Sequence, residues 1–177
     1  MLNKERVKEA ETNVRSYLSE GLIKKTPSNK EIIRILLKNS KESLIVAEEI
    51  SQKNFSDLWV IVCSYYSMFY IANAVLCKFG YKVEEKIVHK VTSDALIVYA
   101  RGKLRDSFIE EYEETKNEAL NLAGIKADSI IEFFELERNK RGFIQYKTEE
   151  IEKHSKAKTS LQRAKIFVKE MEKLLED

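Results

Sequence analysis

Proline is almost absent from this chain, and glycine, cysteine and histidine are scarce. Among 177 residues there are one proline, five glycines, two cysteines and two histidines. Because proline and glycine are the strongest local breakers of regular structure, their scarcity leaves long uninterrupted stretches. These stretches are rich in helix-forming Leu, Ile, Glu, Lys and Ala, and none shows the alternation typical of a strand. We therefore expect an all-α fold with no β-sheet.

The shortage of cysteine, histidine and glycine also excludes several kinds of site. Cys63 and Cys77 would lie about 21 Å apart on one helix, too far for a disulfide within the chain. With only His89 and His154 beside them, we expect no zinc site and no other metal or cofactor. The stretch YARGKLRD has one glycine and no phosphate-loop spacing, which excludes a P-loop ATPase.

The overall charge is too small to indicate bulk binding of nucleic acid. The formal net charge is +2, so any role in anion binding must depend on a local patch. The N-terminal stretch MLNKERVKEAE is charged from its start and has no apolar core typical of a signal peptide. Two free thiols also suit a reducing compartment. We expect a cytoplasmic location.

Only one long run lacks charge, at residues 58–77. Its twenty residues could span a bilayer. The run also contains serines, an asparagine and three tyrosines, and a helix that is apolar all round is what the middle of a bundle requires. We expect a buried central helix, whose polar atoms find partners inside the protein, and no membrane association.

The single proline and the five glycines divide the chain into five to six helices, which we expect to form an antiparallel up-and-down bundle. Residues 1–28 are expected to form an accessory N-terminal helix, and residues 29–177 the bundle domain. The expected helices are 3–19, a second that ends at about 52, 57–79, 86–100, 103–141 and 149–175. Ser28 or Asn29 is expected to cap the second helix and Asp57 the third, and the fifth is expected to break near Gly124.

The last of these helices carries a narrow apolar seam. Its positions are spaced by three and four residues along one side of the helix: Ala157, Leu161, Ala164, Val168, Met171 and Leu175. Such a seam packs along a partner helix, either in the same chain or in a second subunit.

The stretch LERNKRGFIQYKTEE, residues 136–150, is the main candidate for a site. Arg138 and Arg141 follow Phe134 by four and seven residues, so both lie on the apolar stripe of their helix or at its edge. Arginine is rarely buried unpaired, and its planar donors match a phosphate. The alternative is an ion pair within the chain or between subunits. Tyr146 could add a hydroxyl to the pair, with Asn139 in support.

The order of several short motifs resembles the HEPN domain (higher eukaryotes and prokaryotes nucleotide-binding). These motifs are CSYYSMFYIANAVLCKFGY, KIVHKVTSDAL, ERNKRGFIQY and AKIFVKEMEKLL, and the likeness covers about residues 30–175. The resemblance implies an antiparallel bundle of four to five helices that forms a dimer. It also implies pairing with a minimal nucleotidyltransferase, often as toxin and antitoxin, and in many members a metal-independent ribonuclease.

The ribonuclease signature of that family is incomplete in this chain. The signature is an arginine, often with a polar residue after it, and a histidine that follows after four to six intervening residues. Arg138 and Asn139 match its start, but the histidine position falls on Phe143, Ile144 or Gln145, or from Arg141 on Tyr146, Lys147 or Thr148. None of these supplies acid–base chemistry near neutral pH. The chain resembles the subgroup that is discussed as nucleotide-binding or as a partner module.

The two histidines are further candidates. The resemblance to HEPN domains implies a role for His89, because many HEPN sequences have a histidine at this place, where the next helix opens. His89 could face a ligand beside the arginine pair, or it could be a capping or interfacial histidine. His154 could replace the missing imidazole.

Three functions therefore remain open at this stage. The first is a homodimeric module that binds a nucleotide or RNA phosphate through Arg138, Arg141, Tyr146, Asn139 and His89 and works with a nucleotidyltransferase. The second is a metal-independent ribonuclease toxin. The third is a purely structural interaction module whose arginines are ion-paired. Whether the chain is an enzyme is left open by the incomplete motif.

Overall fold

The structure is a computed structural model. It describes the backbone of residues 3–84, 87–136 and 150–176, and the side chains of these residues except 123–136 and 150–153. Over this part of the chain there are six α-helices, one short 3-10 helix and two short strands. In chain order these are α1 (Lys4–Ser19), β1 (Ile23–Lys25), α2 (Lys30–Gln52), α3 (Asp57–Lys78), β2 (Tyr81–Val83), α4 (Val88–Tyr99), η1 (Arg101–Lys103), α5 (Asp106–Leu136) and α6 (Glu150–Glu176). The all-α prediction is confirmed.

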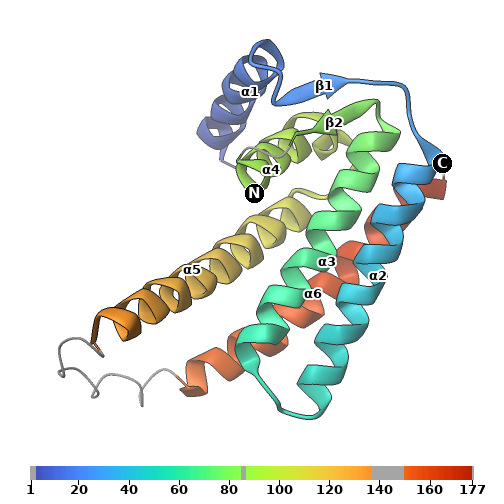
Figure 1. The fold of residues 1–177 in the computed structure, drawn as a ribbon. Coiled ribbons are helices and arrows are strands. Elements are labelled where there is room, and N and C mark those ends of the chain that lie inside the picture. The colour runs from blue at the N-terminus through green and yellow to red at the C-terminus, as the bar shows by residue number, and fades with distance from the viewer. Residues whose placement is uncertain (1–2, 85–86, 137–149, 177) are drawn as a thin grey trace.

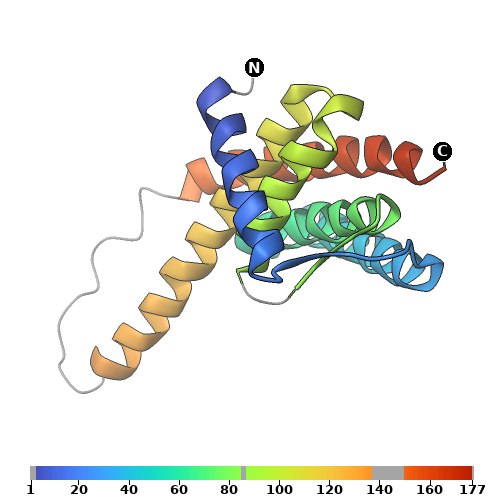
Figure 2. The same cartoon turned by 90° about the horizontal axis from the view of Figure 1, so that it is seen from above.

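Three long helices, α2, α3 and α6, lie side by side, and α1 and α4 pack together at one end of them (Figure 1). Two contacts fix the direction of α6: His154 Nδ1 lies 2.9 Å from Asp57 Oδ1, and Lys78 Nζ donates to the Leu175 carbonyl at 2.9 Å. These contacts join the two helix starts and the two helix ends, so α3 and α6 run in the same direction. The first half of α5 packs on this group, and its second half leaves the bundle (Figure 2).

The central helix α3 is the most buried part of the fold, as its uncharged sequence predicted. It is long and apolar enough to cross a membrane, but 72% of the apolar window is buried within the protein, as in a soluble core helix. Several of its polar atoms have partners: Ser40 Oγ donates to the Ser67 carbonyl at 2.8 Å, and Asn73 Nδ2 donates to the Phe69 carbonyl at 2.9 Å. Ser64 Oγ is buried with no hydrogen-bond partner in the described part of the chain.

The predicted seam of α6 packs against α3 within the same chain. Ala157, Leu161, Ala164, Val168 and Met171 are buried in the main hydrophobic cluster, together with the residues of α3. Small alanines at two of these positions allow a close approach of the helices. Because the seam is already covered, it gives no support to a second subunit.

The expectation that the chain forms no sheet was wrong. Strands β1 and β2 pair antiparallel, with Ile23 opposite Val83 and Lys25 opposite Tyr81. Gly80 has φ +85°, and a Cβ there would lie 3.2 Å from the Thr26 carbonyl oxygen, so glycine is needed where the chain leaves α3 for β2. Each strand has only three residues, too few to show the alternation by which strands are found in a sequence.

Two further details differ from the sequence predictions. The cap of α3 is Ser56, whose Oγ accepts from the Trp59 amide at 3.4 Å, whereas Asp57 is the first helical residue. Helix α5 continues through Gly124 without a break. A single glycine in a helix costs about 1 kcal/mol relative to alanine, which a 31-residue helix tolerates. Asn29 caps α2, as predicted, by accepting from two amides.

Candidate functional site

Four of the five predicted site residues, Arg138, Asn139, Arg141 and Tyr146, lie outside the described residues. The fifth, His89, lies in the first turn of α4. Ile87 immediately before this helix has φ 43°. A positive φ is a true outlier for a β-branched side chain, so the chain enters α4 through a strained residue. His89 is therefore held at the opening of α4, where the sequence placed it.

His89 is hydrogen-bonded and surrounded by aromatic rings. Its Nδ1 lies 2.7 Å from the hydroxyl of Tyr65 on α3. The imidazole centroid lies 4.9 Å from that of Phe69 and 6.0 Å from that of Tyr66. We call Tyr65, Tyr66, Phe69, Tyr70 and His89 the aromatic cluster.

The protonation state of His89 follows from this environment. Burial lowers the pKa of His89 below its ordinary value, and the charge of Lys116 on α5 lowers it further. Burial raises the pKa of Tyr65, so at neutral pH the phenol keeps its proton and can donate to Nδ1 of a neutral imidazole. When Tyr65 donates in this way, the imidazole proton lies on Nε2, which can donate to another group.

Lys116 is a half-buried cation next to this histidine. Its Nζ donates to Ser93 Oγ at 3.3 Å, and no carboxylate of the described residues lies within 4.0 Å of Nζ. Burial is the largest cause that lowers the pKa of Lys116, and Glu113 opposes it. Lys116 is thus a half-buried ammonium whose charge is offset by Glu113 and Asp94 without direct contact.

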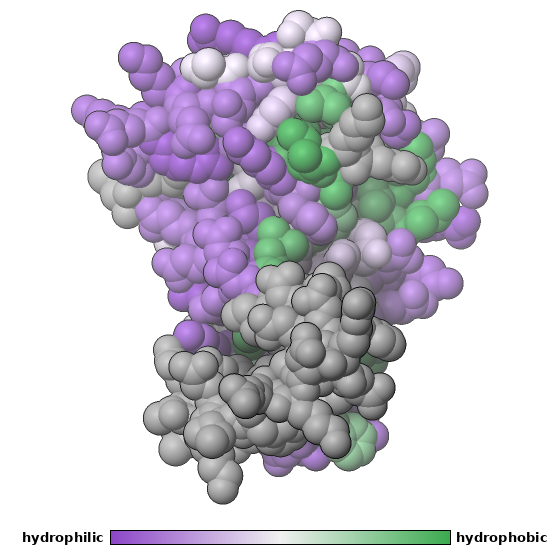
Figure 3. Space-filling view, turned by 60° about the vertical axis from the view of Figure 1, so that its left-hand side comes forward, coloured by the Kyte–Doolittle hydropathy of each residue, from purple (hydrophilic) through white to green (hydrophobic). Residues whose placement is uncertain are grey.

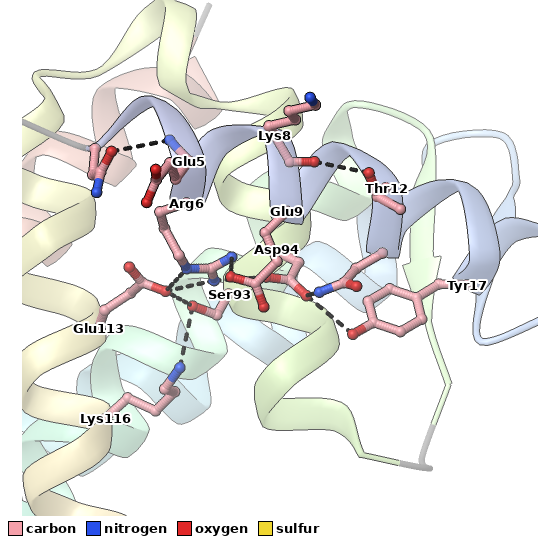
Figure 4. Close-up of polar contacts among 12 residues, drawn as sticks. Glu5, Arg6, Lys8, Glu9, Thr12, Tyr17, Ser93, Asp94, Glu113 and Lys116 are labelled. Carbon is pink, nitrogen blue, oxygen red and sulfur yellow. Dashed lines mark hydrogen bonds and ion pairs between the residues drawn. The ribbon is translucent and has the colours of Figure 1, made fainter.

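Beyond Ser93 the polar contacts continue into a denser group, shown in Figure 4. Arg6 of α1 donates to Asp94 Oδ1 at 2.6 Å and to Glu113 Oε1 at 2.6 Å. Asn13 and Tyr17, also on α1, donate to Asp94 Oδ2, each at 3.0 Å. Ser93 Oγ donates to Glu113 Oε1 at 2.9 Å. We call the side chains of this group the ionic cluster: Arg6, Asn13, Tyr17, Ser93, Asp94 and Glu113.

The ionic cluster joins α1 to the bundle. Asp94 is fully buried, and both of its oxygens accept hydrogen bonds from α1. Val14 and Tyr17 of α1 also belong to the main hydrophobic cluster. Because Asp94 is fully buried and already accepts three hydrogen bonds, its carboxylate is not accessible to a ligand, and the cluster holds the fold together.

His154 has a different environment from His89. It lies on α6 and contacts Asp57 at the start of α3, whereas His89 lies on α4 beside α5. The two histidines are therefore not brought together in one site.

A surface cavity of about 500 Å³ lies between the start of α2 and the ends of α3 and α6. Two of the cations in its wall are already engaged, because Lys41 pairs with Glu172 at 2.9 Å and Lys78 caps the end of α6. Lys41 and Lys78 thus serve contacts between helices. Among the residues described, no group of three or more His, Cys, Asp or Glu side chains is arranged to hold a metal ion.

Sequence reasoning proposed His89 as a site residue and did not consider Lys116. Tyr65 and Phe69 share a face of α3 by their spacing of four, and His89 and Ser93 share a face of α4 in the same way. Lys116 lies in the run EEYEETKNE, which reads as a solvated face. Its burial depends on the packing of α5 against α3 and α4, which no local pattern reveals.

The fold places the chain among all-α helical bundles. No family model matches its sequence, and neither the curated proteins nor the solved structures provide a match. The chemistry of the site must therefore be argued from its own residues. A neutral imidazole, a half-buried ammonium and several rings can bind an anion that carries an aromatic group.

Proposed function

We propose that this protein is a module that binds a nucleotide or RNA phosphate, acts as a homodimer and works alongside a minimal nucleotidyltransferase in the cytoplasm. The observation that carries the proposal is the ammonium of Lys116, which donates to Ser93 one turn after His89 on α4 and contacts no carboxylate among the described residues. The resemblance to HEPN domains supports the same class of ligand.

Each group at this position has a defined role in the proposal. Lys116 supplies a positive charge, and Nε2 of the neutral His89 supplies a hydrogen-bond donor to a phosphate oxygen. Tyr65 holds the imidazole in orientation through its hydrogen bond to Nδ1. Arg138 and Arg141 remain the predicted second phosphate contact, with Tyr146 and Asn139 beside them.

The homodimer is supported by exposed apolar side chains on α2. Ile32, Ile35 and Val46 are all more than a third exposed. Their spacing of three and eleven residues places them along one side of the helix. Apolar side chains in a row on a solvent-facing helix are typical of a surface that contacts another chain. Light scattering should give the mass of a dimer at micromolar concentration, and the mass of a monomer there would contradict this part of the proposal.

The binding part is tested by titrating ATP and a short single-stranded RNA at two salt concentrations. Losing a charge-assisted contact costs about 1.5–3 kcal/mol, roughly tenfold to a hundredfold in affinity. We expect such a loss for Lys116→Gln, Arg138→Ala and Arg141→Ala. The matched controls are Lys169→Gln, an exposed cation of α6, and Lys140→Ala, which should bind like the wild type. Equal losses in all five variants would mean diffuse binding, and the proposal would fail.

One observation favours the second candidate, a metal-independent ribonuclease. In the tautomer whose Nδ1 donates to the Tyr65 hydroxyl, Nε2 of the neutral His89 imidazole is free and can take up a proton from an RNA 2′-hydroxyl. The test is cleavage of RNA in the presence of a chelator. Robust cleavage that both His89→Gln and Arg138→Ala abolish would establish the ribonuclease. Binding of RNA without cleavage would support the non-catalytic binding module instead.

A further inference from the structure

Ten large apolar side chains are exposed in the described part of the chain. On the face shown in Figure 3 the coloured surface is largely hydrophilic, and the hydrophobic patches gather in its upper half. Three aromatic residues are among the exposed large hydrophobics in the described part of the chain: Phe55, Trp59 and Tyr66. Of these, Tyr66 alone belongs to the aromatic cluster.

Tyr66 is an exposed ring supported by rings on several sides. Its centroid lies 5.7 Å from Tyr65, 6.2 Å from Phe69, 6.0 Å from Tyr70 and 6.0 Å from His89. Tyr65 is fully buried, whereas Tyr66 is 37% exposed. The neighbouring rings therefore fix the orientation of Tyr66 but do not cover it.

The hydroxyl of Tyr66 does not explain why this ring is placed there. No hydrogen bond joins it to any of the described residues, in contrast to the hydroxyl of Tyr65, which bonds to His89. Buried tyrosines usually find a partner for the hydroxyl. What Tyr66 offers at the surface is thus the aromatic ring itself.

A cation is bonded to α4 one turn after the imidazole that contacts this ring. His89 contacts Tyr66 edge to face at an interplanar angle of 82°, and Lys116 Nζ donates at 3.3 Å to Ser93 Oγ, four residues after His89. Lys90, the residue after His89 on α4, is exposed, and its positive charge lowers the pKa of Lys116. An aromatic platform beside positive charge is how proteins bind unpaired bases, because every base has a face that stacks.

We propose that Tyr66 stacks an unpaired base of single-stranded RNA whose phosphate lies at Lys116 and His89. This inference rests on the proposed function and narrows its ligand from any phosphate to RNA with an unpaired base. A second copy of the chain is the other occupant that an exposed ring could receive. The imidazole 6.0 Å from Tyr66 and the ammonium of Lys116 one turn further along α4 favour RNA, since its phosphate compensates the charge of the ammonium, whereas burying a cation in a subunit contact is costly unless the second copy supplies a carboxylate.

The test uses single-stranded RNA that contains 2-aminopurine, whose fluorescence falls on stacking. Losing one base–aromatic stack costs about 1–3 kcal/mol, roughly fivefold to a hundredfold in affinity. We expect that loss and a loss of quenching for Tyr66→Leu, while Tyr66→Phe, which keeps a ring, binds like the wild type. Trp59→Leu is the matched control, an exposed aromatic residue on the same helix that lies outside the aromatic cluster. The unfolding midpoint of each variant is measured to show that it is folded.

The outcomes separate the two proposals. If Tyr66→Leu binds RNA like the wild type while Lys116→Gln binds weakly, stacking is wrong and phosphate binding stands. If the wild-type protein binds no RNA and no nucleotide, both proposals fail. If Tyr66→Leu lowers the mass measured by light scattering, a second copy covers the ring and the stacking inference is overturned. An RNA with an abasic position should bind the wild type and Tyr66→Leu equally.

Discussion

The ionic cluster and the aromatic cluster meet on one turn of α4, yet they differ in how completely their groups are paired. Asp94 is fully buried, and both of its oxygens accept hydrogen bonds. One turn earlier, His89 has a partner for Nδ1, while Lys116 donates to a serine hydroxyl and contacts no carboxylate among the described residues. Buried charged groups in folded proteins are normally paired. The paired carboxylate of Asp94 thus marks a structural contact, and the unpaired ammonium of Lys116 marks a place where a ligand can supply the opposite charge.

The largest effect is expected in the ionic cluster. Removing one member of a buried ion pair leaves its partners without compensation and costs about 3–5 kcal/mol. Asp94→Ala removes the acceptor for Arg6, Asn13 and Tyr17 at once. We expect a loss of that size in the free energy of unfolding, measured by urea denaturation. A loss below about 1 kcal/mol would mean that the cluster contributes little beyond a neutral hydrogen bond.

A smaller loss is expected from the hydrogen bond inside the aromatic cluster. Tyr65→Phe keeps the buried ring and removes the hydroxyl that bonds to His89. Such a bond contributes about 0.5–1.5 kcal/mol, which urea denaturation can measure. Tyr70→Phe is the matched control, because no described residue hydrogen-bonds to the Tyr70 hydroxyl, and it should change stability by less than about 0.5 kcal/mol. Equal effects in both variants would show that the hydroxyl of Tyr65 has no special role.

The two clusters also show what a sequence can and cannot predict. The buried helix α3 and the seam of α6 follow from composition and from spacing along the chain, and both were predicted. The bond between Arg6 and Asp94 joins residues 88 positions apart, and no local pattern signals it. The pairing of β1 with β2 was missed for the same reason. His89 was proposed as a site residue because it opens a helix, whereas the half-buried position of Lys116 follows from the packing of α5 and has no local signal in the sequence.

The aromatic cluster should make stability depend on pH. The pKa of His89 in the folded protein is lowered, so the unfolded chain, with an ordinary value of about 6.5, binds the proton more readily. The stability contributed by neutral His89 is therefore fully present above pH ~6.5 and is lost as pH falls through the lowered value. Urea midpoints at about pH 7.5 and pH 5 should differ less in His89→Gln than in the wild type. An identical difference in both proteins would show that His89 is not the titrating group.

The smallest effect is expected at the exposed edge of the ionic cluster. Arg6 Nη1 also approaches Glu9 Oε2 at 3.7 Å, but the Glu9 side chain is 57% exposed. Exposed pairs three residues apart on a helix contribute about 0.5 kcal/mol or less, and Glu9→Gln should lower stability by no more than that. In about 1 M salt the Debye length falls to roughly 3 Å, so the difference from the wild type should disappear. The loss in Asp94→Ala should persist at that salt concentration, because a buried pair is screened much less. If salt removed both differences equally, the Arg6–Asp94 contact would behave as a surface pair. The contrast between the paired charges of the ionic cluster and the unpaired charge next to the aromatic cluster would then fail.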